Sequence, residues 1–246
     1  MIEFCDVVKE FDGRRVLDGL SFKIAQGELF VVAGPSGSGK TVTLKLIGGL
    51  LSPSSGCVQV DGVDVGSAGR DALRGIRSRM GYLFQSGALL AWLSLFENIA
   101  LPLRENTTMT EDEIEKRVME MLEMVGLEAD GAKFPAEISG GMCKRAGLAR
   151  ALVMKPDIVL FDEPTSGLDP VMARQIDALI RDLTSRLKMT GIVVTHDLRG
   201  ALNYADRIGL LGAGTFAELA TPAEFVKSQN EEVKSFLKAQ FIDQKG

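Results

Sequence analysis

The stretch Gly34-Pro35-Ser36-Gly37-Ser38-Gly39-Lys40-Thr41 fits the pattern G-x-x-x-x-G-K-[ST], which is typical of loops that bind nucleotide phosphates. It follows an apolar run at 29–33, which predicts a strand buried on both faces, and it precedes a helix predicted over 42–47. In such a loop the glycines let backbone N–H groups converge on phosphate oxygens, and the helix N-terminus adds positive potential. We therefore expect Lys40 to contact the β- and γ-phosphates and the Thr41 hydroxyl to bind Mg²⁺.

Two acidic residues supply the second half of this kind of site. Asp162 and Glu163 follow the apolar run at 158–161, which predicts another buried strand. We expect Asp162 to hold Mg²⁺ through water, and Glu163 to polarise a water molecule in line with the γ-phosphate. Two acids after a strand could also be a solvated strand end, and only their pairing with the phosphate loop favours the catalytic interpretation.

Strands and helices alternate along much of the chain, which predicts an α/β fold around a largely parallel sheet. Strands are predicted in both the first and the last third of the sequence, at 2–8, 22–24, 29–33, 58–60, 158–161, 192–195 and 208–211. Between them, residues 86–151 are mainly helical and include a capping box that begins at Thr110. We treat 1–246 as a single domain, with a nucleotide-binding core at 1–85 and 152–246 and a helical lobe at 86–151.

Composition excludes several classes of protein. The 246 residues are 46% hydrophobic, enough for a substantial core, and carry a formal net charge of −5, which argues against a nucleic-acid partner. The three cysteines lack metal-ligand spacing, as in a reduced cytosolic protein. The N-terminus has no secretory signal, and the longest apolar stretch, 88–96, is too short to span a membrane.

The segment Ile138-Ser139-Gly140-Gly141-Met142 narrows the class, because it resembles the L-S-G-G-Q signature of ABC ATPases. The other motifs of that family follow in order: Gln85 as the Q-loop, 166–169 as the D-loop and His196 as the switch histidine. The resemblance covers nearly the whole chain. It implies a P-loop NTPase core with a mostly parallel sheet, an N-terminal antiparallel β subdomain and an inserted helical lobe, with ATP and Mg²⁺ as cofactors.

The signature segment itself predicts a second anion site. Ser139 suits a helix N-cap, and Gly140 and Gly141 expose N–H groups at the start of the next helix. One nucleotide does not need two such sites on one chain, so we expect a two-fold homodimer in which each signature binds the partner's ATP. Met142 replaces the usual Gln, and it cannot return a capping-box hydrogen bond to the N-cap.

The family resemblance also assigns roles to three residues whose local sequence is ambiguous. His196, the single histidine, would contact the γ-phosphate or the attacking water from an edge strand beyond Glu163, although a lone histidine is more often a surface or core residue. Gln85 would contact Mg²⁺ and water, or is an ordinary polar strand end. Phe11 would stack on adenine, or is about equally well explained as a buried strand residue.

Three further segments, at 85–90, 102–105 and 142–145, look like the Mla/Mkl (toluene-tolerance, phospholipid transport) branch of the family, from which Trp92 departs. That branch implies an ATPase peripheral to the inner face of the cytoplasmic membrane, working with an integral permease and an MCE-type lipid-binding subunit. Two alternatives stay open: the ATPase of a polar-solute importer, and a non-transport subunit that drives envelope-remodelling partners. An ATPase acting on ribosomes or DNA is disfavoured, because there is no second cassette and no basic surface.

The connection at 86–96 is more apolar than a loop beside a catalytic Gln requires. Leu95 and Phe96 are expected to pack inside the helical lobe. The remainder, 89–93, is a candidate contact surface for a short cytoplasmic helix of a permease, with Trp92 as an exposed anchor.

We expect Ser139→Arg to abolish ATP hydrolysis while leaving nucleotide binding intact, because the bulky side chain blocks only the partner's phosphate. Steady-state turnover and equilibrium binding of a fluorescent ATP analogue measure the two effects separately. Loss of nucleotide binding by the monomeric variant would show that Ser139 acts within its own subunit.

Overall fold

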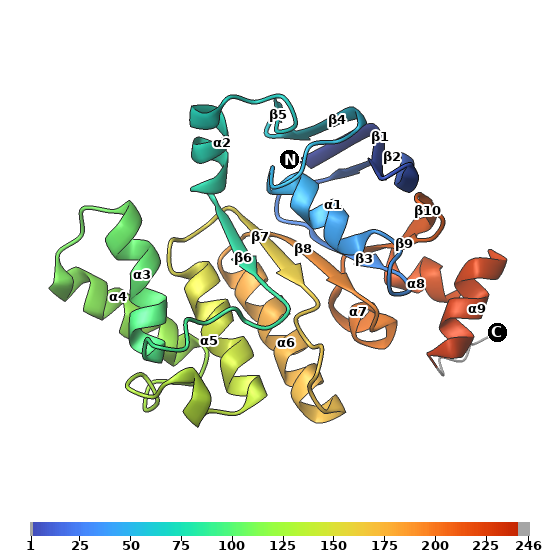
Figure 1. Cartoon of the computed structure of the whole chain (residues 1–246). Helices are drawn as coiled ribbons and strands as arrows, with labels where there is room; N and C mark the ends of the chain where they lie inside the picture. Colours follow the sequence, from blue (N-terminus) through green and yellow to red (C-terminus); the bar gives the residue numbers. More distant parts are fainter. Residues whose placement is uncertain (1, 241–246) are drawn as a thin grey trace.

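A six-stranded, mostly parallel sheet forms the centre of the computed structural model, which describes residues 2–240 (Figure 1). Its strand order is β10-β9-β3-β8-β7-β6, and only β10 runs antiparallel to its neighbour. The strands are β3 (Leu29–Ala33), β6 (Met80–Leu83), β7 (Ile158–Asp162), β8 (Thr190–Thr195), β9 (Arg207–Leu211) and β10 (Phe216–Ala220). The predicted parallel sheet is confirmed.

A second, antiparallel sheet contains most of the N-terminal strands, in the order β2-β1-β4-β5. They are β1 (Ile2–Phe11), β2 (Arg14–Ile24), β4 (Ser55–Val60) and β5 (Val63–Asp64). β1 and β2 extend further than predicted, because they meet in a tight hairpin at Asp12 (φ 49°) and Gly13 (φ 78°). Positive φ at both turn residues matches the right-handed twist of the flanking strands. The exposed, charged hairpin tip lacks the apolar alternation that identified the inner parts of both strands.

The central strand β3 is buried on both faces, and the hydrophobic core is divided accordingly. Phe30 and Val32 pack toward α1 (Lys40–Ile47) and the antiparallel sheet, whereas Leu29 and Val31 pack toward α6 (Pro170–Arg186) and the helical lobe. This is the continuous apolar run expected of a strand covered on both sides.

The inserted helical lobe consists of α3 (Leu95–Asn106), α4 (Glu111–Met124) and α5 (Gly140–Leu152), at the left of Figure 1. The capping box between Thr110 and Glu113 at the start of α4 is confirmed. Leu95 is fully buried and Phe96 packs against the core, as expected. Side chains of all three helices join the cluster beneath the parallel sheet, so the lobe and the sheet share one hydrophobic core.

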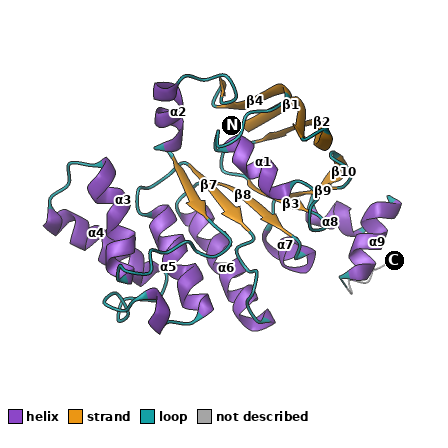
Figure 2. Cartoon of the chain, viewed as in Figure 1, coloured by secondary structure: helices purple, strands orange, loops and turns teal. Residues whose placement is uncertain are grey.

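Several short elements were not predicted from the sequence, and Figure 2 shows the α-helices among them around the sheets. They are α2 (Arg70–Arg77), the 3₁₀ turn Pro135–Glu137, α7 (Leu198–Tyr204), α8 (Pro222–Val226), α9 (Glu231–Ala239) and strand β10. Most have fewer than three turns, too few for a clear apolar period. Across residues 2–240, no helix has both the length and the apolar character needed to cross a bilayer.

Candidate active site

The predicted phosphate loop joins β3 to α1, and two of its glycines are required by their surroundings. A Cβ on Gly34 would lie 2.5 Å from the backbone oxygen of Leu211 on β9. Gly39 is the N-cap of α1 and adopts a φ of 104°, which side chains disfavour. Since Gly39 has no side chain to cap the first N–H groups of α1, these groups are open to an anion such as phosphate.

The Lys40 ammonium is turned back onto its own loop. Its Nζ donates hydrogen bonds of 2.9 Å to the carbonyl oxygens of both Gly34 and Pro35, and it lies 3.7 Å from Oε1 of Glu163. Burial lowers the pKa of Lys40, while Glu163 and Asp162 favour its charged form. Phosphate oxygens are stronger acceptors than neutral carbonyls, so a bound triphosphate can replace the two carbonyl oxygens as the acceptor of the Lys40 hydrogen bonds.

A hydroxyl and a carboxylate adjoin at the start of α1 and the end of β7. The Thr41 hydroxyl donates a 3.0 Å hydrogen bond to Oδ1 of Asp162, whose side chain is buried. Burial raises the pKa of Asp162, and the hydrogen bond from Thr41 opposes that rise. Mg²⁺ in nucleotide sites is usually held by one or two protein oxygens together with phosphates and water, and this pair fits that donor set.

Glu163 and His196 form the reactive pair of the site. Nδ1 of His196 lies 2.7 Å from Oε2 of Glu163, and the Glu163 carboxylate is 13% exposed whereas the imidazole is 54% exposed. Glu163 has a φ of 47°, which is rare for a residue with a side chain and is typical of strained functional positions. The expected edge-strand position of His196 was wrong: it follows β8, which lies between β3 and β7.

Gln85 completes a cleft of about 460 Å³ on this edge of the sheet. It follows the edge strand β6, and its Nε2 donates a 3.3 Å hydrogen bond to the Ser166 hydroxyl. The cleft is lined by Val16, Ser36, Gly37, Gly39, Lys40, Thr41, Val42, Gln85, Glu163, Ser166 and His196. The structure therefore brings the phosphate loop, both catalytic candidates and the Q-loop residue into one cavity.

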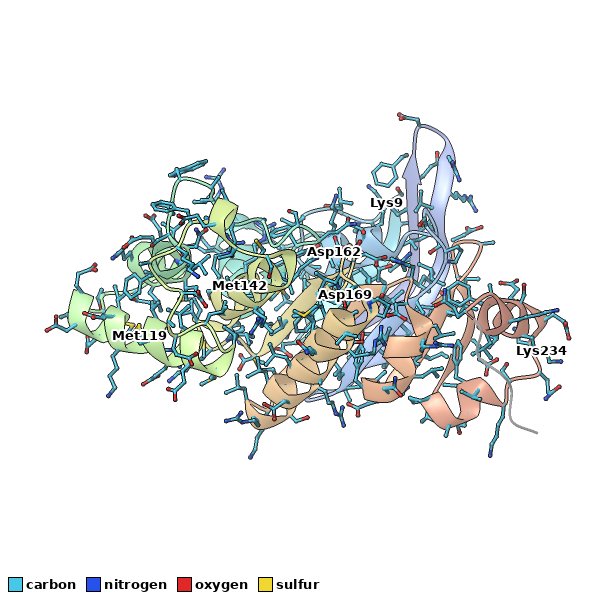
Figure 3. All side chains as sticks on the ribbon, turned by 90° about the horizontal axis from the view of Figure 1, so that it is seen from below. Lys9, Met119, Met142, Asp162, Asp169 and Lys234 are labelled. Carbon is cyan, nitrogen blue, oxygen red and sulfur yellow. The ribbon has the colours of Figure 1, made fainter. Side chains whose placement is uncertain are left out.

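The remaining predicted site residues lie outside this cleft lining. Phe11 is the last residue of β1 and is 41% exposed. The Lys9 ammonium lies 4.8 Å from the centre of its ring, so a cation covers the ring face that was predicted to stack on adenine. Ser139 is the N-cap of α5, as predicted, and its hydroxyl accepts a 3.3 Å hydrogen bond from the Met142 N–H. In Figure 3, Met142 lies on the helical lobe, apart from Asp162 at the end of β7.

Sequence reasoning missed one charged residue of the site, Lys144 on α5. Its side chain is only 5% exposed and donates to the backbone oxygens of Gln85 and Glu163. A signal was present, because Lys144 shares one helix face with the apolar residues Leu148 and Ala151, four and seven positions later.

Comparison with known proteins identifies the family. The family model described as "ABC transporter" matches residues 17–166. This chain belongs to the ABC transporter ATP-binding family. The ABC ATPase is 42% identical, over 98% of its length and 70% of the other chain, to the "probable ribonucleotide transport ATP-binding protein mkl" of Mycobacterium leprae. It is 40% identical, over 98% of its length and 91% of the other chain, to the "intermembrane phospholipid transport system ATP-binding protein MlaF" of Haemophilus influenzae.

A solved structure supports the same chemistry for this ABC ATPase. The dimeric post-hydrolysis state of the ATP-binding cassette MJ0796, bound to ADP and Pi, matches with a TM-score of 0.82 and 33% identity, over 90% of this chain and 99% of that one. The fold, the phosphate loop and the family together make the protein an ATP-binding ATPase.

We expect Glu163→Gln to keep nucleotide binding but to lower turnover by on the order of 100-fold or more, because the amide cannot accept a proton from water. Gel filtration in Mg·ATP should then show an ATP-locked dimer. Lys40→Ala should weaken ATP binding itself, because it removes the phosphate's cationic donor. Near-normal turnover by Glu163→Gln would exclude Glu163 as the base.

Proposed function

We propose that this ABC ATPase works as a homodimer that closes on two molecules of ATP. Each phosphate loop would hold the triphosphate of one ATP, and the N-terminus of the partner's α5, at Ser139, Gly140 and Gly141, would bind its γ-phosphate. The separation of Ser139 from its own cleft supports this arrangement, as does the dimeric state of the similar cassette.

Within each site, we assign the roles from the geometry. Thr41 and Asp162 would hold Mg²⁺, with Gln85 beside it, and the metal would supply charge neutralisation at the phosphates. Glu163 accepts the proton of the attacking water, and His196, whose Nδ1 lies 2.7 Å from the Glu163 carboxylate, orients that carboxylate. Once the γ-phosphate is bound, the ring would donate its N–H to the phosphate in place of the carboxylate. Lys40 binds the β- and γ-phosphates.

For the transported cargo, we propose phospholipid or a related lipid. The identity of 40% with the phospholipid-transport protein MlaF, over 91% of that chain, carries this proposal. The ATPase would then lie at the inner face of the cytoplasmic membrane and drive an integral permease, together with an MCE-type lipid-binding subunit. The second candidate is a polar-solute transporter, which the ribonucleotide-transport name of the Mycobacterium leprae relative favours.

Purification of the ATPase from its native membranes distinguishes the two cargoes. We expect a permease and phospholipids to be co-extracted, and phospholipid to raise the ATPase activity of the reconstituted complex. Matched assays with ribonucleosides and ribonucleotides provide the comparison. Stimulation by these solutes, with none by phospholipid, would overturn the lipid proposal in favour of the polar-solute alternative.

The permease would dock in a groove of about 500 Å³ between α2 and β6 on one side and α3 and α5 on the other. Its aromatic side is formed by Tyr82 and Phe84, whose stacked rings lie 4.1 Å apart. Arg70, Arg74 and Arg77 on α2 also line it, so we expect an acidic residue beside the apolar anchor of the partner segment. Phe84 directly precedes Gln85, which would connect the groove to the ATP site.

Trp92 would extend this contact surface. Its side chain is 72% exposed, in agreement with the sequence-based prediction, although Leu89 in the same stretch packs against the core. Exposed tryptophans are frequent anchors of protein interfaces, and Trp92 does not itself line the groove.

We expect Trp92→Ala and Phe84→Ala each to weaken permease binding by about 2 kcal/mol, or about 30-fold. Trp92→Ala should leave the melting temperature of the isolated subunit unchanged, whereas Phe84→Ala should lower it slightly, because it removes the ring that stacks on Tyr82. Met119→Ala is the control, because Met119 is exposed on α4 of the helical lobe (Figure 3) and does not line the groove. Recovery with solubilised permease measures binding. Normal recovery of both variants would exclude this surface.

A further inference from the structure

The signature helix α5 carries a buried cation that no part of the phosphate-binding motif requires. Lys144 lies five residues after the N-cap Ser139, and its side chain is 5% exposed. Burying an ammonium is unfavourable unless it is well hydrogen-bonded, and burial lowers the pKa of Lys144. Glu163 and Asp162 act in the opposite direction and favour the charged form.

The Lys144 ammonium contacts the backbones of two catalytic candidates. Its Nζ donates a hydrogen bond to the carbonyl oxygen of Gln85 and a 3.3 Å hydrogen bond to that of Glu163. Gln85 comes from the end of β6 and Glu163 from the end of β7, whereas Lys144 comes from the helical lobe. One side chain of the lobe therefore links two residues of the nucleotide-binding core whose side chains line the cleft.

A second cation of α5 fastens the residues that follow Gln85. Arg150 donates to the carbonyl oxygens of Gly87 at 2.9 Å and Ala88 at 2.8 Å. Backbone also lies close to backbone here, because a Cβ on Gly147 would come within 3.1 Å of the Gly87 carbonyl oxygen. The Q-loop is thus held directly against the signature helix.

The rest of the connection is fastened to α3 by Asn98, which is fully buried. Its amide oxygen accepts from the Leu90 N–H, and its amide nitrogen donates to carbonyl oxygens of Leu90, Leu93 and Ser94. Residues 85–94 are therefore held against the helical lobe, and from them the Gln85 side chain donates across to Ser166 in the core.

We propose that Lys144 is a positioning residue for ATP hydrolysis. It holds the backbones of Gln85 and Glu163 together and ties both to the signature helix. The rate of hydrolysis then depends on where α5 lies, whereas the affinity of a single subunit for ATP, which its own phosphate loop provides, does not. A movement of the lobe against the core therefore shifts Gln85 and Glu163, while the contacts between the phosphate loop and ATP stay the same.

Lys144→Met tests this inference, because Met fills a similar volume without charge or donors. We expect kcat to fall by roughly 10- to 100-fold while the Kd of a fluorescent ATP analogue changes less than about threefold. Lys144→Arg, which keeps charge and donors, should restore most of kcat. Arg145→Met is the matched control: Arg145 is the next residue on α5 and also donates to two carbonyl oxygens, those of Val125 and Gly126, but away from the cleft.

A double-variant cycle separates positioning from general stability. In a Glu163→Gln background, Lys144→Met should reduce the residual turnover much less than it does alone, because the two residues act on the same step. The proposal would be overturned if Lys144→Met and Arg145→Met lowered kcat equally. A loss of ATP affinity as large as the loss of kcat in Lys144→Met would overturn it as well. The proposal would also be overturned if Lys144→Met and Lys144→Gln both melted at a lower temperature than Arg145→Met. Lys144 would then serve only the stability of the fold.

Discussion

The parallel pairing of β3, β8 and β7 is the interaction on which the site depends. Ala33 pairs with Thr195, so the phosphate loop and His196 leave the sheet at the same level. Asp162 pairs with Val194, which places Glu163 level with Thr195 and one step from the imidazole. The register of these strands is fixed because both of their faces are buried in the core. The strand ends therefore place the phosphate loop, Glu163 and His196 relative to one another.

This arrangement gathers four charged side chains in a small volume. Two buried ammonium groups, Lys40 and Lys144, act on the same two carboxylates, Asp162 and Glu163, and each carboxylate favours the charged form of both lysines. Formally the four charges cancel before any nucleotide arrives. A triphosphate adds negative charge to this balance, so a divalent cation entering with it is electrostatically favourable. The strained backbone of Glu163 is tolerated because the Glu163 N–H is held by the Val194 carbonyl at 2.9 Å.

Motifs with fixed spacing could be predicted from the sequence because each one depends on local chemistry. The phosphate loop, the paired acids at the end of β7 and the N-cap at Ser139 all lie where the sequence placed them. Features that depend on neighbours far along the chain could not be predicted. The central place of β8 follows from strand order, which local periodicity does not encode. The contacts of Lys144 join residues 59 and 19 positions away, and a lysine by itself predicts solvent exposure.

The fastening of residues 85–94 to the helical lobe has a practical consequence. Trp92, the single tryptophan of the chain, lies on that segment and is 72% exposed. Its intrinsic fluorescence is therefore free of background from other indoles. The emission reports the solvent around one defined point between the ATP cleft and the surface of the lobe. Lobe motion and partner docking can thus be followed optically in the unlabelled protein, on the timescale of a stopped-flow mixing experiment.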